Sequence, residues 1–304
     1  MSADLSVNAL FRVDGMIAVV TGGGTGIGLA MARALAVNGA KRVYLLGRRA
    51  APLAVAATQN PGVFDAVQCD VTDKASLQAV VDKITRDVGY VNLVIANAGA
   101  IGSPKRWDPS PSKSIAELRK DLFTDNSMEE MTAAFQVNVT GAFFTMTAFL
   151  ELLDAGNKEA LKGGFGKPLT EGSKVPSVQS QVIITSSISA FSRHAASVPA
   201  YCGSKAAIMQ LAKQAATQLG GHGIRVNALA PGIFPSDLAS GIMASRKPEE
   251  ETPDNTMFIP AKRFGTDEEM AGTLLYLASR AGAYCNGSAH VVDGGRLAVM
   301  PSTY

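Results

Sequence analysis

Tyr201 and Lys205 are well suited to acid/base chemistry, because they are four residues apart at the start of a predicted helix and share one face of it. A phenol with its ordinary pKa of about 10 moves protons poorly at neutral pH. An ammonium one helical turn away stabilises the phenolate and lowers that pKa, so the pair predicts a general acid/base. Ser187, fourteen residues before Tyr201 at the end of a predicted strand, could hold a carbonyl oxygen by hydrogen bonding. The three side chains could polarise a ketone and protonate the alkoxide that forms when a dinucleotide delivers hydride.

A glycine-rich run, TGGGTGIG at residues 21–28, follows an apolar stretch at 16–20 and precedes a helix-forming stretch rich in Ala and Leu at 29–37. Glycines let a backbone turn tightly and approach a pyrophosphate, and the helix behind them offers unpaired N–H groups and the positive end of its dipole. Turns and helix caps also collect glycine, so the run alone is weak evidence. Between a strand and a helix, it predicts a phosphate cradle for a dinucleotide.

The elements that would position these residues are short apolar runs that alternate with helical patterns along almost the whole chain. Strands are expected at 16–21, 42–47, 63–69, 91–96, 181–186, 224–229 and 288–292. Buried strands separated by helices indicate βαβ units and a parallel sheet with helices on both faces. We therefore predict an α/β fold of the Rossmann type, doubly wound with about seven strands, in a single domain spanning residues 1–304. Ligands of such folds lie outside the carboxyl ends of the strands, where the motifs above fall.

Two segments interrupt this alternation and are interpreted as insertions. Residues 101–125 follow the fourth strand and contain Pro104, Trp107, Pro109 and Pro111, whereas residues 156–180 are rich in Gly, Lys, Pro and Ser. Long irregular loops in a compact domain are usually functional or disordered. We assign the first to the mouth of the substrate site, with a mobile surface loop as the alternative. We assign the second to a mobile surface loop, with the mouth of the substrate site as the alternative.

Composition excludes several classes of function. The 304 residues are 47% hydrophobic with a net charge of +2, and no run of like charges indicates a nucleic-acid arm or a membrane-binding patch. No apolar stretch reaches the roughly 20 residues of a membrane span, and residues 1–12 lack the pattern of a secretory signal, so a soluble cytoplasmic protein is expected. Three widely spaced cysteines favour reduced thiols, and three scattered histidines predict no metal site. The expected partners are a small-molecule substrate and copies of the chain itself.

Taken together, the motifs make the chain resemble the short-chain dehydrogenase/reductase family. They occur in the family's order over residues 14–295: the glycine run, Asp70-Val71 after the third strand, Asn97-Ala98-Gly99 after the fourth, Asn138 in a helix, Ser187, YCGSK at 201–205, and Pro231-Gly232 after the sixth strand. The resemblance implies that Tyr201 is the acid/base and that Ser187 orients the carbonyl. It implies that Lys205 lowers the pKa of Tyr201 and binds the nicotinamide ribose, and that Asn138 holds a proton-relay water.

The expected cofactor contacts follow from the same resemblance and from the end of the second strand. Asp70 and Val71 would form the adenine pocket, and Ser236, where the family usually has Thr, would reach the carboxamide. The full set is Thr21, Gly22, Gly24, Thr25, Gly26, Ile27, Gly28, Arg48, Arg49, Asp70, Val71, Asn97, Ala98, Gly99, Tyr201, Lys205, Pro231, Gly232, Ile233 and Ser236.

The chain departs from the family pattern near the catalytic serine. The interval between Ser187 and Tyr201 is one residue longer than is common in the family, so Ser187 and Ser189 are alternative orienters. Ser187 is favoured because it directly follows the apolar strand and Ser186. A second departure, Ala96 in place of an additional Asn, is expected to affect strand packing more than chemistry.

The end of the second strand predicts which nicotinamide cofactor binds. Enzymes of this kind that use NAD place an acidic residue there to accept hydrogen bonds from the ribose hydroxyls. Here the strand ends Leu46-Gly47-Arg48-Arg49, with no carboxylate, and Arg48 offers a guanidinium suited to a 2′-phosphate. NADP is therefore the predicted cofactor; the alternative is that the arginines only solvate the start of a helix.

These features predict an NADP-dependent oxidoreductase that interconverts a ketone and a secondary alcohol. A carbonyl reductase resembling the β-ketoacyl or secondary-metabolite reductases of the family is favoured, since Met243, Met257 and Phe258 in the last variable segment indicate an apolar cavity. A sugar or polyol dehydrogenase and a non-catalytic NADP-binding sensor are the alternatives. The resemblance also implies a homotetramer or homodimer assembled through helices near residues 128–153 and 201–219.

Overall fold

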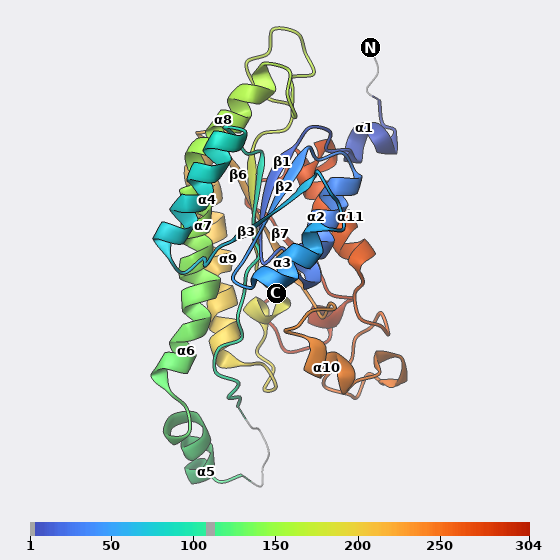
Figure 1. The fold of residues 1–304 in the computed structure, drawn as a ribbon. Helices are drawn as coiled ribbons and strands as arrows, with labels where there is room; N and C mark the ends of the chain where they lie inside the picture. The colour runs from blue at the N-terminus through green and yellow to red at the C-terminus, as the bar shows by residue number, and fades with distance from the viewer. Residues whose placement is uncertain (1–3, 108–112) are drawn as a thin grey trace.

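The structure is a computed structural model that describes residues 4–107 and 113–304, and its centre is a seven-stranded sheet (Figure 1). All neighbouring strands are parallel, in the order β3-β2-β1-β4-β5-β6-β7. The strands are β1 (Ile17–Thr21), β2 (Arg42–Gly47), β3 (Phe64–Gln68), β4 (Leu93–Ala96), β5 (Gln181–Thr185), β6 (Arg225–Pro231) and β7 (Ala289–Val292). Each strand lies where the sequence predicts it, with ends that differ by no more than two residues. The predicted α/β Rossmann-type fold is confirmed.

Helices cover both faces of the sheet because the strands are apolar on both sides. In β1, Ile17 and Val19 belong to one core cluster and Ala18 and Val20 to the other, which is the two-residue period of a strand buried on both faces. The first face packs against α4, α7, α8 and α9, and the second against α2, α3 and α11 (Figure 1). Their bounds are α2 (Gly26–Val37), α3 (Ala50–Ala57), α4 (Lys74–Asp87), α7 (Ala142–Ala148), α8 (Leu150–Leu161), α9 (Pro199–Gly220) and α11 (Asp267–Ala278).

The remaining helices are short and lie mostly outside these two layers. They are α1 (Val7–Phe11), α5 (Ile115–Arg119), α6 (Met128–Phe135) and α10 (Ser240–Ala244). Between α6 and α7 the chain widens into a π-helical turn, η2 (Gln136–Gly141), which contains Asn138. Such turns occur often at functional sites, because the extra residue re-aims the side chains around it.

The two predicted insertions differ in where they lie. The first, 101–125, is not wholly irregular as expected, since it forms α5 and a second π-helical turn at Lys120–Thr124; Pro109 and Pro111 lie outside the described residues. The second, 156–180, begins inside α8, which continues to Leu161. Figure 1 places the loop between α8 and β5 at the end of the sheet opposite to α10. Only the first insertion is near the carboxyl ends of the strands.

The helices of the described residues offer little that could span a membrane. Within residues 4–107 and 113–304, no single helix is long and apolar enough to cross a membrane. One pair, Met128–Ala148 with Leu150–Leu161, meets the criteria of length and composition together but is bent by 45°.

Candidate active site

A cavity of about 970 Å³ opens at the carboxyl ends of the strands, and nearly all predicted site residues line it. Its wall includes the glycine loop, the segments after β2, β3, β4, β5 and β6, and the start of α9. The expected residues on the wall are Gly22, Gly24, Thr25, Gly26, Ile27, Gly28, Arg48, Arg49, Asp70, Val71, Asn97, Ala98, Gly99, Ser187, Tyr201, Lys205, Pro231, Gly232, Ile233 and Ser236. Thr21 and Asn138 are buried behind it. Residues far apart in the sequence thus share one cavity.

The glycine loop is packed so closely that larger residues are excluded at particular positions. A Cβ added at Gly28 would lie 2.3 Å from the carbonyl oxygen of Gly22 and 2.6 Å from Nδ2 of Asn97. Gly22 and Gly26 have φ angles of +66° and +55°, in the left-handed region that favours glycine. The first turn of α2 therefore presents its unpaired N–H groups to the cavity, and this cradle fits the phosphates of a dinucleotide.

Thr21 braces this loop from behind the wall. Its hydroxyl donates to the carbonyl oxygen of Ile95 at 3.3 Å and accepts from the backbone N–H groups of Asn97 and Ala98 at 2.9 and 3.0 Å. Thr21 is 1% exposed. In this structure it joins β1 to the segment after β4, and does not itself line the cavity.

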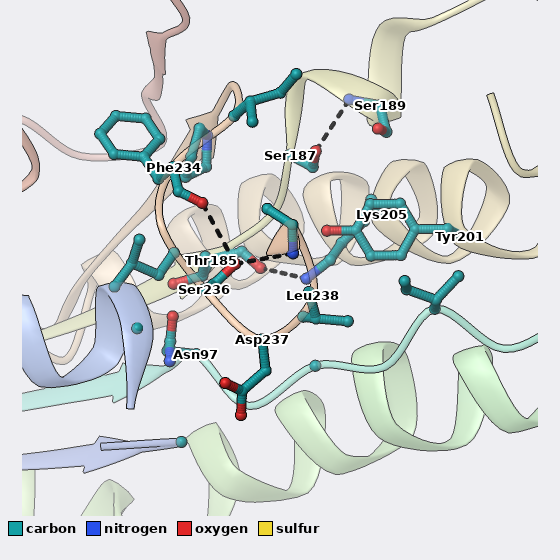
Figure 2. A pocket seen from close by; sticks show the side chains of 18 of the residues that line it. Asn97, Thr185, Ser187, Ser189, Tyr201, Lys205, Phe234, Ser236, Asp237 and Leu238 are labelled. Carbon is teal, nitrogen blue, oxygen red and sulfur yellow. Dashed lines mark hydrogen bonds between the residues drawn. The ribbon is translucent and has the colours of Figure 1, made fainter. Parts of the chain in front are cut away.

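Lys205 and Tyr201 lie together on α9 and face Ser187 at the end of β5 (Figure 2). The Lys205 ammonium donates to the carbonyl oxygen of Thr185 at 2.8 Å and lies 5.6 Å from the centroid of the Tyr201 ring. The sequence predicted this shared helix face. Burial lowers the pKa of Lys205 to about 8, because a low-polarity environment disfavours the charged form.

The pKa of the Tyr201 hydroxyl is shifted by its surroundings. Burial raises the pKa of the Tyr201 hydroxyl, and a side-chain hydrogen bond with Ser187 acts in the opposite direction without reversing the shift. Burial of the phenol is the largest cause of this upward shift, so the lowering of the pKa by Lys205 stays a prediction. Tyr201 is therefore a neutral phenol at neutral pH.

The structure distinguishes Ser187 from Ser189 by their neighbours. The Ser187 side chain forms a hydrogen bond with Tyr201 that acts to lower the pKa of the phenol. The Ser187 oxygen also accepts from the backbone N–H of Ser189 at 3.1 Å (Figure 2). The Ser189 hydroxyl instead forms a hydrogen bond with Cys202, a half-buried thiol whose pKa burial raises. The longer interval before Tyr201 thus leaves Ser187 next to the phenol.

Asn138 connects the segment after β4 to α9. Its Oδ1 accepts from the Ala100 N–H at 2.8 Å, and its Nδ2 donates to the Ala100 carbonyl oxygen at 2.8 Å and to Ser204 Oγ at 2.9 Å. Both amide protons are used in these contacts. In this arrangement the Asn138 side chain holds the wall of the cavity in place through Ser204, the residue that precedes Lys205 on α9.

The end of β2 contains two arginines with different surroundings. Arg49 forms an ion pair of 2.7 Å with Asp237, a residue of the segment after β6, and lies 3.5 Å from Thr25 Oγ1. The Arg48 guanidinium is exposed, and in the described parts of the chain it forms no hydrogen bond and no ion pair. A Cβ added at Gly47 would meet only Leu53 carbons at 3.6–3.7 Å, an ordinary contact distance. Arg48 is thus the available cation at this end.

Asp70, two residues after the end of β3, lies close enough to Arg48 for their charges to interact. Its Oδ1 accepts from the N–H and the hydroxyl of Thr72 at 2.9 and 2.7 Å, and these bonds lower the pKa of its carboxyl, with a smaller contribution from Arg48. The carboxylate therefore stays ionised at neutral pH. It lines the cavity as an acceptor.

Several cavity residues escaped the sequence interpretation. Asp237 pairs with an arginine 188 residues away, so no local pattern could indicate it. His194 and Arg296 also line the wall, and the signal that could have found Arg296 is an arginine directly after the Asp-Gly-Gly turn that follows β7.

Comparison with known families matches both halves of the chain. The family described as short chain dehydrogenase matches residues 16–161, and the one described as Enoyl-(Acyl carrier protein) reductase matches residues 169–296. The short-chain dehydrogenase/reductase SAT3 of Stachybotrys chartarum is 57% identical over 90% of this chain and 100% of its own length. PhomF of Diaporthe leptostromiformis, also named a short-chain dehydrogenase/reductase, is 45% identical over 97% and 96%. The D-threitol dehydrogenase of Mycolicibacterium smegmatis is 30% identical over 96% of each chain.

Solved structures of similar fold include two that are named for a phosphorylated nicotinamide cofactor. The RhlG/NADP active-site complex of Pseudomonas aeruginosa has a TM-score of 0.75 and 28% identity, over 95% of this chain and 98% of that one. The NADPH-dependent 3-quinuclidinone reductase of Rhodotorula rubra has a TM-score of 0.70 and 26% identity, over 97% and 96%.

Proposed function

This chain belongs to the short-chain dehydrogenase/reductase family of oxidoreductases, and on that premise we propose that it reduces a ketone to a secondary alcohol with NADPH. The observation that carries the proposal is the grouping of Ser187, Tyr201 and Lys205 in one cavity with the phosphate cradle of α2. A nicotinamide dinucleotide, when bound there, supplies the hydride. The residues of the chain supply proton transfer and orientation.

Tyr201 is the proposed proton donor. A neutral phenol has a proton to give to the oxygen of a ketone as that oxygen becomes an alkoxide, and the raised pKa of Tyr201 keeps it neutral at neutral pH. Ser187 would hold the same oxygen by hydrogen bonding. Because the pKa of Lys205 is about 8, its side chain is mostly charged at neutral pH and favours the phenolate left after proton transfer.

Asn138 is proposed to support this proton transfer from behind the wall. The relay water implied by the family resemblance stays a proposal, and the amide contacts to Ala100 and Ser204 fix the backbone around such a water. Lys205 has two ammonium protons beyond the one it gives to Thr185, and these are available to a ribose hydroxyl.

NADP is the proposed cofactor because the end of β2 carries cations and lacks the acid that would accept from ribose hydroxyls. Arg48 is unpaired among the described residues, so its guanidinium is available to a 2′-phosphate, whereas Arg49 already pairs with Asp237. The similar structures of the RhlG/NADP complex and of the NADPH-dependent 3-quinuclidinone reductase support this choice.

Oxidation of a polyol is the second candidate function, because D-threitol dehydrogenase is among the relatives. The proposed reduction is favoured by the apolar side chains that line the cavity, which include Ile101, Leu238, Ile242, Met257 and Met300. Hydroxyl groups of a polyol that lie against these apolar side chains would have no hydrogen-bond partners.

The test is a panel of aryl ketones and β-keto esters with NADPH or NADH, and of polyols with NADP⁺ or NAD⁺, followed by nicotinamide absorbance. Reduction of at least one ketone class with a preference for NADPH is expected. Turnover of polyols alone, or a preference for NADH, would contradict the proposal.

Three further expectations remain proposals. We treat residues 1–304 as one domain with two insertions, since all seven strands join one sheet. A homotetramer or homodimer assembled through α6, α7 and α9 is the proposed assembly, and sedimentation at micromolar concentration would test it. The cytoplasm is the proposed location, in keeping with the three free cysteines.

A further inference from the structure

Arg296 is a buried cation on the wall of the cavity. It begins the short 3-10 turn Arg296–Ala298 after β7, is 5% exposed, and lines the cavity beside His194, Met257 and Met300. Its guanidinium donates to the carbonyl oxygens of Phe258 at 2.9 Å and Thr256 at 3.2 Å, and to Met257 Sδ at 3.4 Å. A guanidinium carries five N–H groups, so two have no acceptor among the described residues.

The carboxylates near Arg296 are engaged elsewhere. Glu251, buried like Arg296, forms a bidentate pair with Arg246, with both distances 2.8 Å. Asp293 accepts from the N–H groups of Gly295 at 2.9 Å and Leu297 at 2.7 Å. Within the described residues no carboxylate oxygen lies within 4.0 Å of the Arg296 guanidinium. Burial and the charge of Arg246 lower the pKa of Arg296, and the charges of Glu251 and Asp293 offset this only in part, since the net shift is downward.

This cation lies at the substrate end of the cavity. The chain after Arg296 returns to the loop that follows the Ser187 turn: Arg193 N–H donates to Pro301 O at 2.8 Å, and Thr303 N–H donates to Phe191 O at 2.8 Å. His194, in the same loop, lines the cavity and is close enough for the charge of Arg296 to lower its pKa, after the larger effect of burial.

His194 offers a second hydrogen-bond donor on the cavity wall. Its Nδ1 accepts from the N–H of Ala196 at 3.1 Å, and its pKa is lowered, so the neutral ring carries its proton on Nε2. The exposed Arg106 also lines the cavity.

A buried guanidinium whose charge is only partly compensated is unfavourable unless something pairs with it. We propose that Arg296, with His194, binds a carboxylate on the substrate, so that the protein prefers ketones that carry a carboxylate away from the reacting carbonyl. A planar carboxylate matches the N–H groups of a guanidinium. This inference rests on the proposed function, because it names a feature of the ketone that the protein would reduce.

Arg225 provides the matched control, because Arg296 could instead serve only to hold the 256–258 segment. Arg225 is also buried and donates to three backbone carbonyl oxygens, those of Gly282, Cys285 and Leu277, but it does not line the cavity. Arg225→Met should lower stability without changing which ligands bind. Arg296→Lys keeps the charge at the cavity wall, and Arg296→Met removes it.

The experiment compares 4-acetylbenzoate with its methyl ester, two ketones that differ in the carboxylate. Their dissociation constants are measured by calorimetry for the NADP⁺-loaded parent and for Arg296→Met, Arg296→Lys and Arg225→Met, each checked for folding by circular dichroism. The parent should bind the carboxylate at least about tenfold more tightly than the ester, as expected for a charge-assisted contact. Arg296→Met should lose this preference while keeping the affinity for the ester, Arg296→Lys should keep part of it, and Arg225→Met all of it.

The inference is overturned if the parent binds the two ketones equally, prefers the ester or binds neither, or if folded Arg296→Met keeps the preference. If Arg296→Met fails to fold, loss of the preference in Arg296→Lys with an unchanged ester affinity supports the inference, and its full retention together with the same preference in His194→Ala overturns it. Binding is measured without turnover. A carboxylate preference in a protein that reduces no ketone would therefore contradict the proposed function while leaving the anion site in place.

Discussion

Replacing Lys205 with methionine should change how the stability of the protein depends on pH. The pKa of Lys205 falls from the ordinary 10.5 to about 8 because the ammonium is buried. One pKa unit corresponds to roughly 1.4 kcal/mol, so holding this ammonium in the folded state costs on the order of 3 kcal/mol near neutral pH. Lys205→Met keeps the length of the side chain and removes that cost.

The direction in which stability changes with pH follows from the number of protons that the folded and unfolded chains bind. Between about pH 8 and 10.5 the unfolded chain binds more protons at Lys205 than the folded chain does, so the stability of the parent rises with pH across this window. The penalty is complete below the folded pKa and absent above the unfolded one. The stability difference between Lys205→Met and the parent should therefore shrink by about 2 to 3 kcal/mol between roughly pH 7 and pH 10. The lost hydrogen bond to Thr185 O adds a cost that is nearly independent of pH, since the neutral amine also donates.

Urea unfolding followed by far-ultraviolet circular dichroism, at several pH values and one protein concentration, measures this difference. Lys213→Met is the control, because Lys213 is exposed on the same helix, and its stability should follow that of the parent. Parallel stability curves for Lys205→Met and the parent would refute the argument, since the buried ammonium would then carry no penalty.

Two further sets of variants test the cofactor and the orienting serine. Arg48→Ala should weaken NADPH binding by roughly one to two powers of ten while barely changing NADH binding, since a charge-assisted contact is lost, and an unchanged preference would show that Arg48 is only solvated surface. Gly47→Asp, which the space around Gly47 allows, should go further and favour NADH in the same fluorescence titrations. Ser187→Ala should lower kcat about a hundredfold or more and Ser189→Ala little, because Ser187 contacts Tyr201; the reverse ranking in steady-state assays would move the orienting role to Ser189.

Much of the fold could be predicted because strands buried on both faces appear as uninterrupted apolar runs. β2 occupies the predicted residues, and β1 differs by one residue at its start. The shared helix face of Tyr201 and Lys205 was also predictable, since residues four apart are one turn apart in any helix. The position of the site follows from the parallel sheet, which brings the carboxyl ends of all seven strands to one edge.

The parts that could not be predicted depend on tertiary contacts. The raised pKa of Tyr201 depends on how much water the folded chain removes, and no spacing encodes that quantity. The π-helical turn at Asn138 depends on packing against Ala100 and Ser204. The pairing of Arg49 with Asp237 and the approach of Arg296 to His194 join distant segments, so neither residue has a partner that a local pattern indicates.

The most direct test of proton transfer by Tyr201 is the rate of NADPH-dependent ketone reduction by Tyr201→Phe. The ketone that the parent reduces fastest is used, and NADPH affinity is measured on the same samples by nicotinamide fluorescence. Because only the hydroxyl is removed, the turnover rate should fall by a factor of about a hundred to ten thousand, with NADPH affinity and the circular dichroism spectrum unchanged. Turnover within about tenfold of the parent would contradict the account, since the proton would then come from another group.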